Sequence, residues 1–131
     1  MANFKIAWAI TSKIEAGYSN NSKDKGKETW RGVTRVFWPK WEGWKNVDAA
    51  KAKLGLTDTV DASPKVIKPL NDLLFADVAL NALVDSFYKT NYWDTIGLDQ
   101  EQSQLIANKV FDIAVNMGVP TAKEFYGQIR G

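Results

Sequence analysis

Apolar side chains recur at helical spacing near the start of the chain. They predict a first helix over residues 3–15, with Phe4 and Trp8 on its apolar face. At about 100° per residue, Glu15 projects along the same stripe, at the end of the helix. Gly17 is well placed to end the helix in a left-handed conformation. A carboxylate is therefore expected where an apolar face meets a polar loop.

Three further helices are predicted over 47–55, 69–92 and 99–117. The last segment is apolar around most of its circumference, which is typical of a central buried helix. Its polar strip contains Asp112 and Asn116, one helical turn apart.

The segment between the first two helices follows a different pattern. Residues 19–29 are all polar or glycine, and a short β-prone run follows them. We therefore predict a mainly α domain with one small irregular or β-hairpin segment near residues 19–36. The length of 131 residues fits a single domain spanning 1–131.

The composition excludes several kinds of chemistry. The chain has no cysteine and no histidine, which excludes disulfides, thiol nucleophiles and serine–histidine triads. The usual zinc sites also need these ligands, so we expect no metal and no cofactor. Acid–base catalysis would have to use carboxylates, lysine or tyrosine.

Charge and hydropathy narrow the possible partners. The net charge of +2 is too small to indicate a nucleic-acid-binding protein. No apolar run approaches the length of a membrane span, so stable membrane insertion is not expected. The N-terminal residues are too short a stretch, and too interrupted by lysine, for a signal peptide.

Glu15 has the surroundings that a general acid needs. Apolar neighbours raise the pKa of a carboxylic acid, and a helix end beside a loop lets it reach a cleft. On physical grounds alone, a glutamate that turns to solvent is the more common case. A second group would come from the following loop, where the candidates are Asp24, Glu28, Thr29 and Thr34.

Three segments carry a resemblance to a known family. The stretch "EAGYSNNSKDKGKETWRGVT", residues 15–34, resembles the signature of glycoside hydrolase family 108, the phage-type N-acetylmuramidases. "NYWD" at 91–94 and "FDIAVNMGVPTA" at 111–122 resemble two later motifs of that family, in the same order. Together, the matched segments span most of the chain.

The resemblance implies a lysozyme-like fold and a reaction. The expected reaction is hydrolysis of the β-1,4 bond between N-acetylmuramic acid and N-acetylglucosamine in peptidoglycan. It places Glu15 on the catalytic glutamate of the family. Asp24 and Thr29 are the nearest matches to the aspartate and threonine that related phage lysozymes carry in the next loop. The Asp24 carboxylate, or a water held by Asp24 or Thr29, would meet the oxocarbenium-like centre.

Other residues are candidates for binding the glycan. Tyr18, Asn20 and Thr34 lie within the matched signature, and Trp30 could stack on a sugar ring. Packing of the small lobe is the more common role for such a tryptophan. Asn116 with Asp112 could orient the Glu15 loop, although a structural hydrogen bond is the more common role.

The sequence departs from the family signature inside the loop. Asn21 and Ser22 replace an Asp-Pro pair, and Lys25 and Lys27 replace proline and glycine. These changes remove a carboxylate and a rigid turn, so we expect a more basic and more mobile loop. They motivate two alternatives: a non-catalytic peptidoglycan-binding or secretion-accessory protein, and a lytic transglycosylase, which needs only one glutamate.

The resemblance also sets expectations about biological context. We expect a monomeric prophage endolysin that acts on peptidoglycan glycan strands, with a holin-type partner for its release. Without a signal peptide, it would stay cytoplasmic until released to the periplasm or cell wall. The C-terminal part, about 89–131, resembles the start of a peptidoglycan-binding segment, and we would expect a longer one.

Overall fold

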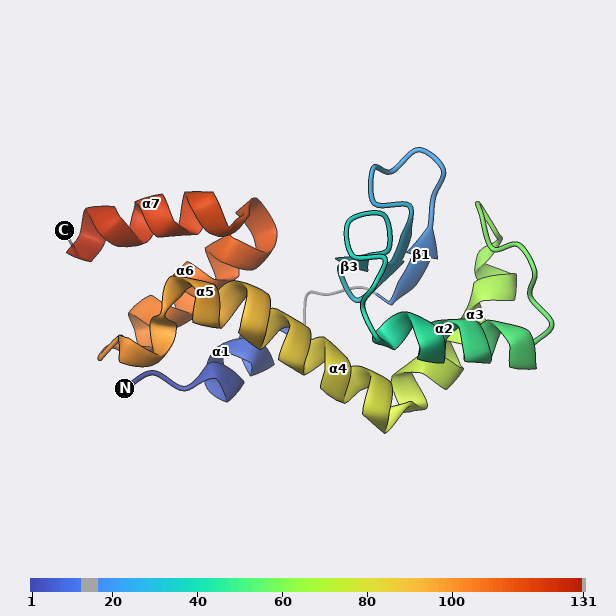
Figure 1. Cartoon of the computed structure of the whole chain (residues 1–131), viewed down its shortest axis with the longest axis horizontal. Coiled ribbons are helices and arrows are strands. Elements are labelled where there is room, and N and C mark those ends of the chain that lie inside the picture. The colour runs from blue at the N-terminus through green and yellow to red at the C-terminus, as the bar shows by residue number, and fades with distance from the viewer. Residues whose placement is uncertain (13–16, 131) are drawn as a thin grey trace. The chain divides into compact units, whose positions relative to one another are not determined.

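The computed structural model describes residues 1–12 and 17–130. The chain divides into two compact units. The terminal unit comprises residues 1–14 and 85–131, and the sheet unit comprises residues 15–84. Both units are drawn in Figure 1, and each is described by itself below. The fold is mainly α with one small sheet, as predicted for a lysozyme-like domain.

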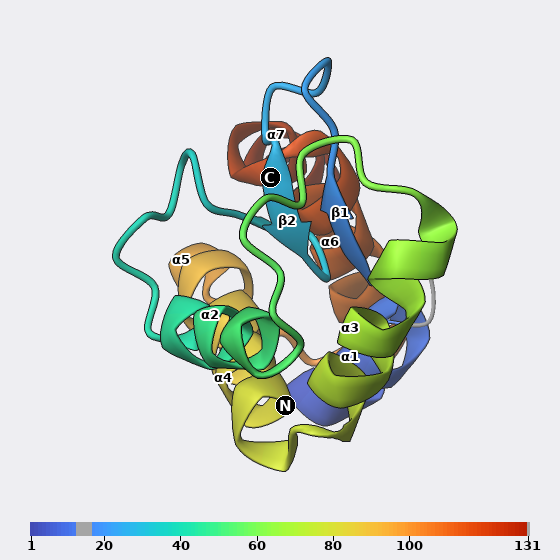
Figure 2. The same ribbon diagram turned by 90° about the vertical axis from the view of Figure 1, so that its right-hand side faces the viewer.

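A three-stranded antiparallel sheet occupies the predicted β segment. Its strands are adjacent in chain order: β1 (Tyr18–Asn20), β2 (Glu28–Trp30) and β3 (Val33–Thr34). Figure 2 shows β1 and β2 side by side. Arg31 and Gly32 connect β2 to β3, and both have a positive φ, of 46° and 84°. Two left-handed residues between paired strands form the tight turn whose twist suits a hairpin.

Two helices pack in the sheet unit beside the strands. They are α2 (Gly43–Lys53) and α3 (Pro64–Ala76), which contact each other, and α3 also contacts β1. The helix predicted over 47–55 is therefore present as α2, and it begins four residues earlier than expected. Gly55 follows its end with a φ of 68°, the left-handed conformation that closes many helices. Ser63 and Pro64 start α3, as their order in the sequence suggests.

The prediction of one long helix over 69–92 is wrong, because the helix breaks at Asp77. This residue is extended (φ −80°, ψ 97°), and its Oδ1 accepts the backbone N–H of Leu80 at 2.9 Å. The Asn81 side chain donates to the carbonyl oxygens of Leu74 and Asp77, at 3.0 and 2.9 Å. Asp77 thus begins a new helix, α4 (Val78–Tyr88), while Asn81 satisfies carbonyl groups freed at the break.

The terminal unit contains the remaining elements. Helix α6 contacts both α1 and α7. The bounds are α1 (Phe4–Thr11), the π-helical turn η2 (Lys89–Trp93), α5 (Asp94–Ile96), the 3-10 turn η3 (Leu98–Gln100), α6 (Gln104–Met117) and α7 (Val119–Arg130). The helix predicted over 99–117 therefore begins five residues late, where the Ser103 hydroxyl caps it by accepting from the Ile106 N–H.

Aromatic rings form the core of the terminal unit. Phe4 lies edge-on to Trp93 and Phe111, with ring centroids 5.6 and 5.5 Å apart, and Trp8 stacks on Tyr88 at 4.7 Å. Phe111 is buried in the middle of α6, as expected for a central helix, whereas residues at both ends of α6 are exposed. The part of the chain that the structure describes has no helix that is long and apolar enough to cross a membrane.

One carboxylate, that of Glu28 on β2, joins the sheet to α2. Its Oε2 accepts hydrogen bonds from the Tyr18 hydroxyl and from Lys51 Nζ, both at 2.6 Å. Its Oε1 accepts from Arg35 Nη1 at 3.0 Å. Arg35 then makes a two-pronged pair with Asp48 on α2, at 2.7 and 2.8 Å. The side chain of Glu28 is only 12% exposed, so removing its charge leaves cations with poor access to water.

We predict that Glu28→Gln lowers the free energy of unfolding by about 1–3 kcal/mol, because a half-buried charged network loses its anion. Urea denaturation of both proteins measures the change. The matched control is Asp72→Asn, which breaks the exposed pair between Lys68 and Asp72. That change should cost less than about 0.5 kcal/mol. Equal effects of the two substitutions would contradict the assigned role of Glu28.

A second buried carboxylate, Glu101, fastens α7 within the terminal unit. It accepts hydrogen bonds from Arg130, from the Ser103 N–H at 2.8 Å and from the Tyr126 hydroxyl at 2.8 Å. The hydrogen bond from Arg130 is the main cause that lowers the pKa of Glu101 to about 2. Its carbonyl oxygen also accepts the Ala2 N–H at 2.8 Å, which ties the start of the chain to the same point.

This network predicts acid sensitivity. A lowered pKa means that ionised Glu101 stabilises the folded state fully above its ordinary pKa of 4.5, and that this stabilisation is lost as the pH falls toward 2. Wild type should therefore lose more stability than Glu101→Gln between pH 5 and pH 2, as measured by thermal unfolding. Parallel pH profiles for the two proteins would contradict the prediction.

Candidate functional site

The loop that carries Asp24 is built from two consecutive turns. The Asp24 N–H donates to the Asn21 carbonyl at 3.1 Å, and the Lys27 N–H donates to the Asp24 carbonyl at 3.2 Å. The Asn21 side chain accepts the Lys23 N–H at 2.9 Å, which is a typical asparagine turn. Asp24 is exposed at the outer end of this loop, nine residues after Glu15 in the sequence.

Thr29 and Thr34 face each other across β2 and β3, beside this loop. The Thr29 hydroxyl donates to the Lys27 carbonyl at 3.1 Å, so its oxygen lone pairs remain available to accept a hydrogen bond from water. Gly26 leaves no space for a side chain, because an added Cβ would lie 2.6 Å from the Thr34 methyl group. The hairpin therefore brings Thr29 and Thr34 together beside Gly26, two residues after Asp24 in the same loop.

Ser22, one of the departures from the family signature, anchors the loop. Its N–H donates to Asp61 Oδ1 at 3.0 Å, and its hydroxyl donates to Asp61 Oδ2 at 2.6 Å. These hydrogen bonds lower the pKa of Asp61. The Asp61 N–H in turn donates to the Asn20 carbonyl at 2.8 Å. A proline at position 22 could make neither bond, so the substitution expected to loosen the loop supplies a tether in its place.

Glu28, the other loop carboxylate considered above, is unsuited to proton donation. Burial alone would raise its pKa, but hydrogen bonds from Lys51 and Tyr18 outweigh this effect and lower the pKa below its ordinary value. Glu28 is therefore ionised at neutral pH and fully engaged by Lys51, Arg35 and Tyr18. Its environment assigns it to holding the sheet rather than to general acid catalysis.

Three predicted binding residues belong to the strands of the sheet: Tyr18 and Asn20 to β1, and Trp30 to β2. Tyr18 is 5% exposed, and burial raises the pKa of its hydroxyl, which contacts Glu28 and Thr59. The Asn20 side chain donates to the Thr59 hydroxyl at 3.1 Å. Trp30 is fully buried and lies edge-on to the ring of Phe75, at 4.8 Å between centroids. Its ring packs the sheet unit, the more common role for such a residue.

Two predicted site residues lie elsewhere. Glu15 lies outside the described residues. Asn116 is on α6 in the terminal unit, where its side chain donates to the Asp112 carbonyl at 2.9 Å and carboxylate at 3.2 Å. The Thr11 hydroxyl donates to the same carboxylate at 3.4 Å, so Asp112 links α1 to α6. Within the terminal unit, Asp112 and Asn116 therefore make structural hydrogen bonds, the role named above as the more common one.

The helix end that Gly17 was predicted to form lies outside the described residues. A Cβ at Gly17 would lie 2.5 Å from the side-chain oxygen of Asn71. That oxygen accepts the Tyr18 N–H at 2.7 Å. Glycine is thus required because α3 approaches the start of β1 closely.

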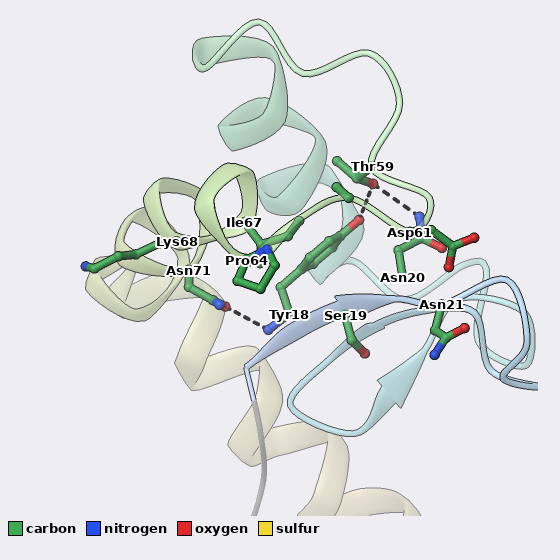
Figure 3. Close-up of a pocket in the computed structure, with 11 residues that line it drawn as sticks. Tyr18, Ser19, Asn20, Asn21, Thr59, Asp61, Pro64, Ile67, Lys68 and Asn71 are labelled. Carbon is green, nitrogen blue, oxygen red and sulfur yellow. Dashed lines mark hydrogen bonds between the residues drawn. The ribbon is translucent and has the colours of Figure 1, made fainter.

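A groove in the sheet unit is lined by two of the predicted binding residues, Tyr18 and Asn20, and by others that the sequence did not single out. It has a volume of about 480 Å³ and lies between β1, the 59–62 segment and the first turns of α3. Figure 3 shows Tyr18, Asn20 and Asn71 around it. Thr59, Asp61 and Asn71 also line it. They form hydrogen bonds with residues of β1 and the following loop that lie 39 to 53 positions away in the sequence. No local pattern could have indicated these pairings. Among the described residues there is no cluster of acidic side chains that could hold a metal.

The hairpin that follows Glu15 in the sequence therefore carries the carboxylate of Asp24 and the hydroxyls of Thr29 and Thr34. The chain has no histidine or cysteine. This set of side chains suits glycosidic bond hydrolysis, which uses carboxylates.

Comparison with protein families gives the same class. The family model described as Glycosyl hydrolase 108 matches residues 8–118, and the chain belongs to this family of glycoside hydrolases. Comparisons with curated proteins and with solved structures found no significant match.

The Ser22 tether gives a testable consequence. Asp61→Ala should speed hydrogen exchange at the Ser22 amide about fivefold or more, because this N–H loses its acceptor. Exchange followed by NMR measures the effect. Asp58→Ala is the matched control, since the Asp58 carboxylate accepts from the Val60 N–H at 2.9 Å. That variant should affect Val60 and leave Ser22 unchanged. An unaltered Ser22 rate in Asp61→Ala would show that the tether does not hold the loop in solution.

Proposed function

We propose that this protein is a peptidoglycan hydrolase that cleaves the β-1,4 bond between N-acetylmuramic acid and N-acetylglucosamine. The match to the glycosyl hydrolase family over residues 8–118 carries the proposal. The arrangement of Asp24, Thr29 and Thr34 on the hairpin directly after Glu15 supports it. We further propose the role of a prophage endolysin, held in the cytoplasm until a holin-type partner releases it.

In the proposed reaction, Glu15 donates its proton to the glycosidic oxygen as the bond to the anomeric carbon breaks. The positive charge that develops on the sugar is stabilised by the Asp24 carboxylate. Water then adds to the anomeric carbon and gives up a proton to a carboxylate, so that both new ends carry hydroxyl groups. The Thr29 hydroxyl donates to a carbonyl, which leaves its oxygen to accept a hydrogen bond from this water and orient it.

The charge pattern of the loop supports binding of an anionic polymer. Lys23, Lys25 and Lys27 surround Asp24 and are all exposed. Carboxylates in the cell wall would be attracted to such a loop, mainly at low ionic strength. The same lysines flank Asp24 in the sequence, so positive charge accompanies this carboxylate in the loop.

We expect Glu15→Gln to reduce cleavage of purified peptidoglycan by about 10²- to 10⁴-fold, because the amide cannot donate the required proton. Release of reducing ends measures the rate, and mass spectrometry identifies the products. Glu42→Gln is the matched control, since Glu42 is an exposed glutamate of the sheet unit. It should retain wild-type activity.

Three outcomes would contradict parts of this proposal. Absence of cleavage by wild type would favour a non-catalytic wall-binding protein. Products with 1,6-anhydro ends would identify a lytic transglycosylase. Full activity of Glu15→Gln would remove Glu15 from the role of acid.

A further inference from the structure

The outer edge of β1 carries hydrogen-bonding groups that face the groove. Along a strand, the N–H and C=O of one residue point to the same side, and those of the next residue point to the opposite side. The Tyr18 N–H bonds to Asn71 and the Asn20 C=O bonds to the Asp61 N–H, both on the side away from β2. The Tyr18 C=O and the Asn20 N–H must therefore point to that same side. The pairing of β2 agrees, because the Glu28 carbonyl opposite Asn20 bonds to Arg35 beyond β3.

These two groups form an open site between two closed ones. Asn71 occupies one end of the β1 edge and the Asp61 backbone occupies the other. Within residues 1–12 and 17–130, neither the Tyr18 carbonyl nor the Asn20 amide between them has a hydrogen-bonding partner. One residue of an added extended chain would match them, since its own N–H and C=O point to one side and can bond to both.

The walls of the groove suit a peptide better than a sugar. Pro64 and Ile67 give it an apolar side, seen beside the Tyr18 ring in Figure 3. Its volume of about 480 Å³ lies in the range of small-ligand sites. Tyr18 is its sole aromatic residue among the described lining and is only 5% exposed, so no ring face is available for a sugar to stack on.

Polar side chains that line the groove also favour a peptide over a sugar. The Asn71 oxygen accepts from the Tyr18 N–H, which leaves its NH₂ group as a donor for a ligand carbonyl. Asp61 and Lys68 give the lining one negative and one positive charge. A short peptide that carries both a carboxylate and an ammonium group can complement both charges, whereas a neutral sugar cannot.

We propose that this groove binds a short extended peptide by strand addition to β1, through the Tyr18 carbonyl and the Asn20 amide. Resting on the proposed function, the occupant is the peptide attached to the muramic acid of peptidoglycan, which carries both carboxylate and amino groups. Such a site would hold the wall polymer by its peptide, separately from the glycan bond that is cleaved. Specificity for the peptide would then come from Ile67, Lys68 and Asp61.

The test is an NMR titration of the intact chain with the free wall tetrapeptide, and in parallel with the peptide-free disaccharide. The tetrapeptide should shift the Asn20 amide signal and slow its hydrogen exchange about tenfold, because the N–H gains an acceptor. The disaccharide should leave the Asn20 amide unchanged. Ile67→Arg, which fills the groove, should weaken peptide binding at least tenfold.

Two exposed lysines on α3 provide a second, milder comparison. Lys68→Glu reverses a charge in the groove lining and should weaken binding, whereas Lys65→Glu lies outside the lining and should not. Unchanged Asn20 exchange at millimolar tetrapeptide would overturn the proposal. So would equal shifts with the disaccharide, or peptide binding that is insensitive to both Ile67→Arg and Lys68→Glu.

Cleavage of glycan strands from which the peptides have been removed separates this proposal from the proposed function. Cleavage without peptide binding would contradict the proposed peptide site and leave the proposed hydrolase activity intact. Peptide binding by a protein that cleaves neither whole peptidoglycan nor bare glycan strands would contradict the proposed hydrolase activity and leave the peptide site intact.

Discussion

The half-buried carboxylate of Glu28 is the group on which the small sheet depends. A sheet with strands of two or three residues has too few backbone hydrogen bonds to be stable alone. Glu28 compensates by accepting from Tyr18 on β1, from Arg35 just after β3 and from Lys51 on α2. Strands β1 and β2, the residue that follows β3 and helix α2 therefore meet at one anion. The hairpin that presents Asp24 and Thr29 is held at its base by this contact.

The contrast between carboxylates shows how environment separates their roles. Glu28 has donors on both oxygens and remains ionised, so it serves structure. Asp61 is exposed and uses both oxygens to hold Ser22. Asp24, which is flanked by lysines in the sequence, is exposed in the loop. The two turns that present it keep their geometry without the proline of the family signature, because Asp61 supplies from a distance what a rigid residue would supply locally.

The sequence predicted the parts of the molecule that depend on neighbouring residues. The polar and glycine-rich segment was correctly assigned to a small irregular or β-hairpin segment. The helix predicted from residue 69 was placed too late, because α3 begins at Pro64. The break at Asp77 was missed because apolar periodicity continues through it. An aspartate three residues before Leu80 is nonetheless a local capping signal that could have been read. The contacts of Tyr18 could not, since Thr59 and Asn71 lie 41 and 53 residues away.

The same distant contacts connect the groove to the chain around Glu15. Gly17 and Tyr18 follow Glu15 by two and three positions in the sequence. Asn71 fixes both of them, because it accepts the Tyr18 N–H and leaves no room for a side chain at Gly17. A ligand bound to the β1 edge would rest against this Asn71 contact. Occupation of the groove would thus restrain the backbone at Gly17 and Tyr18, two and three positions after the proposed acid in the sequence.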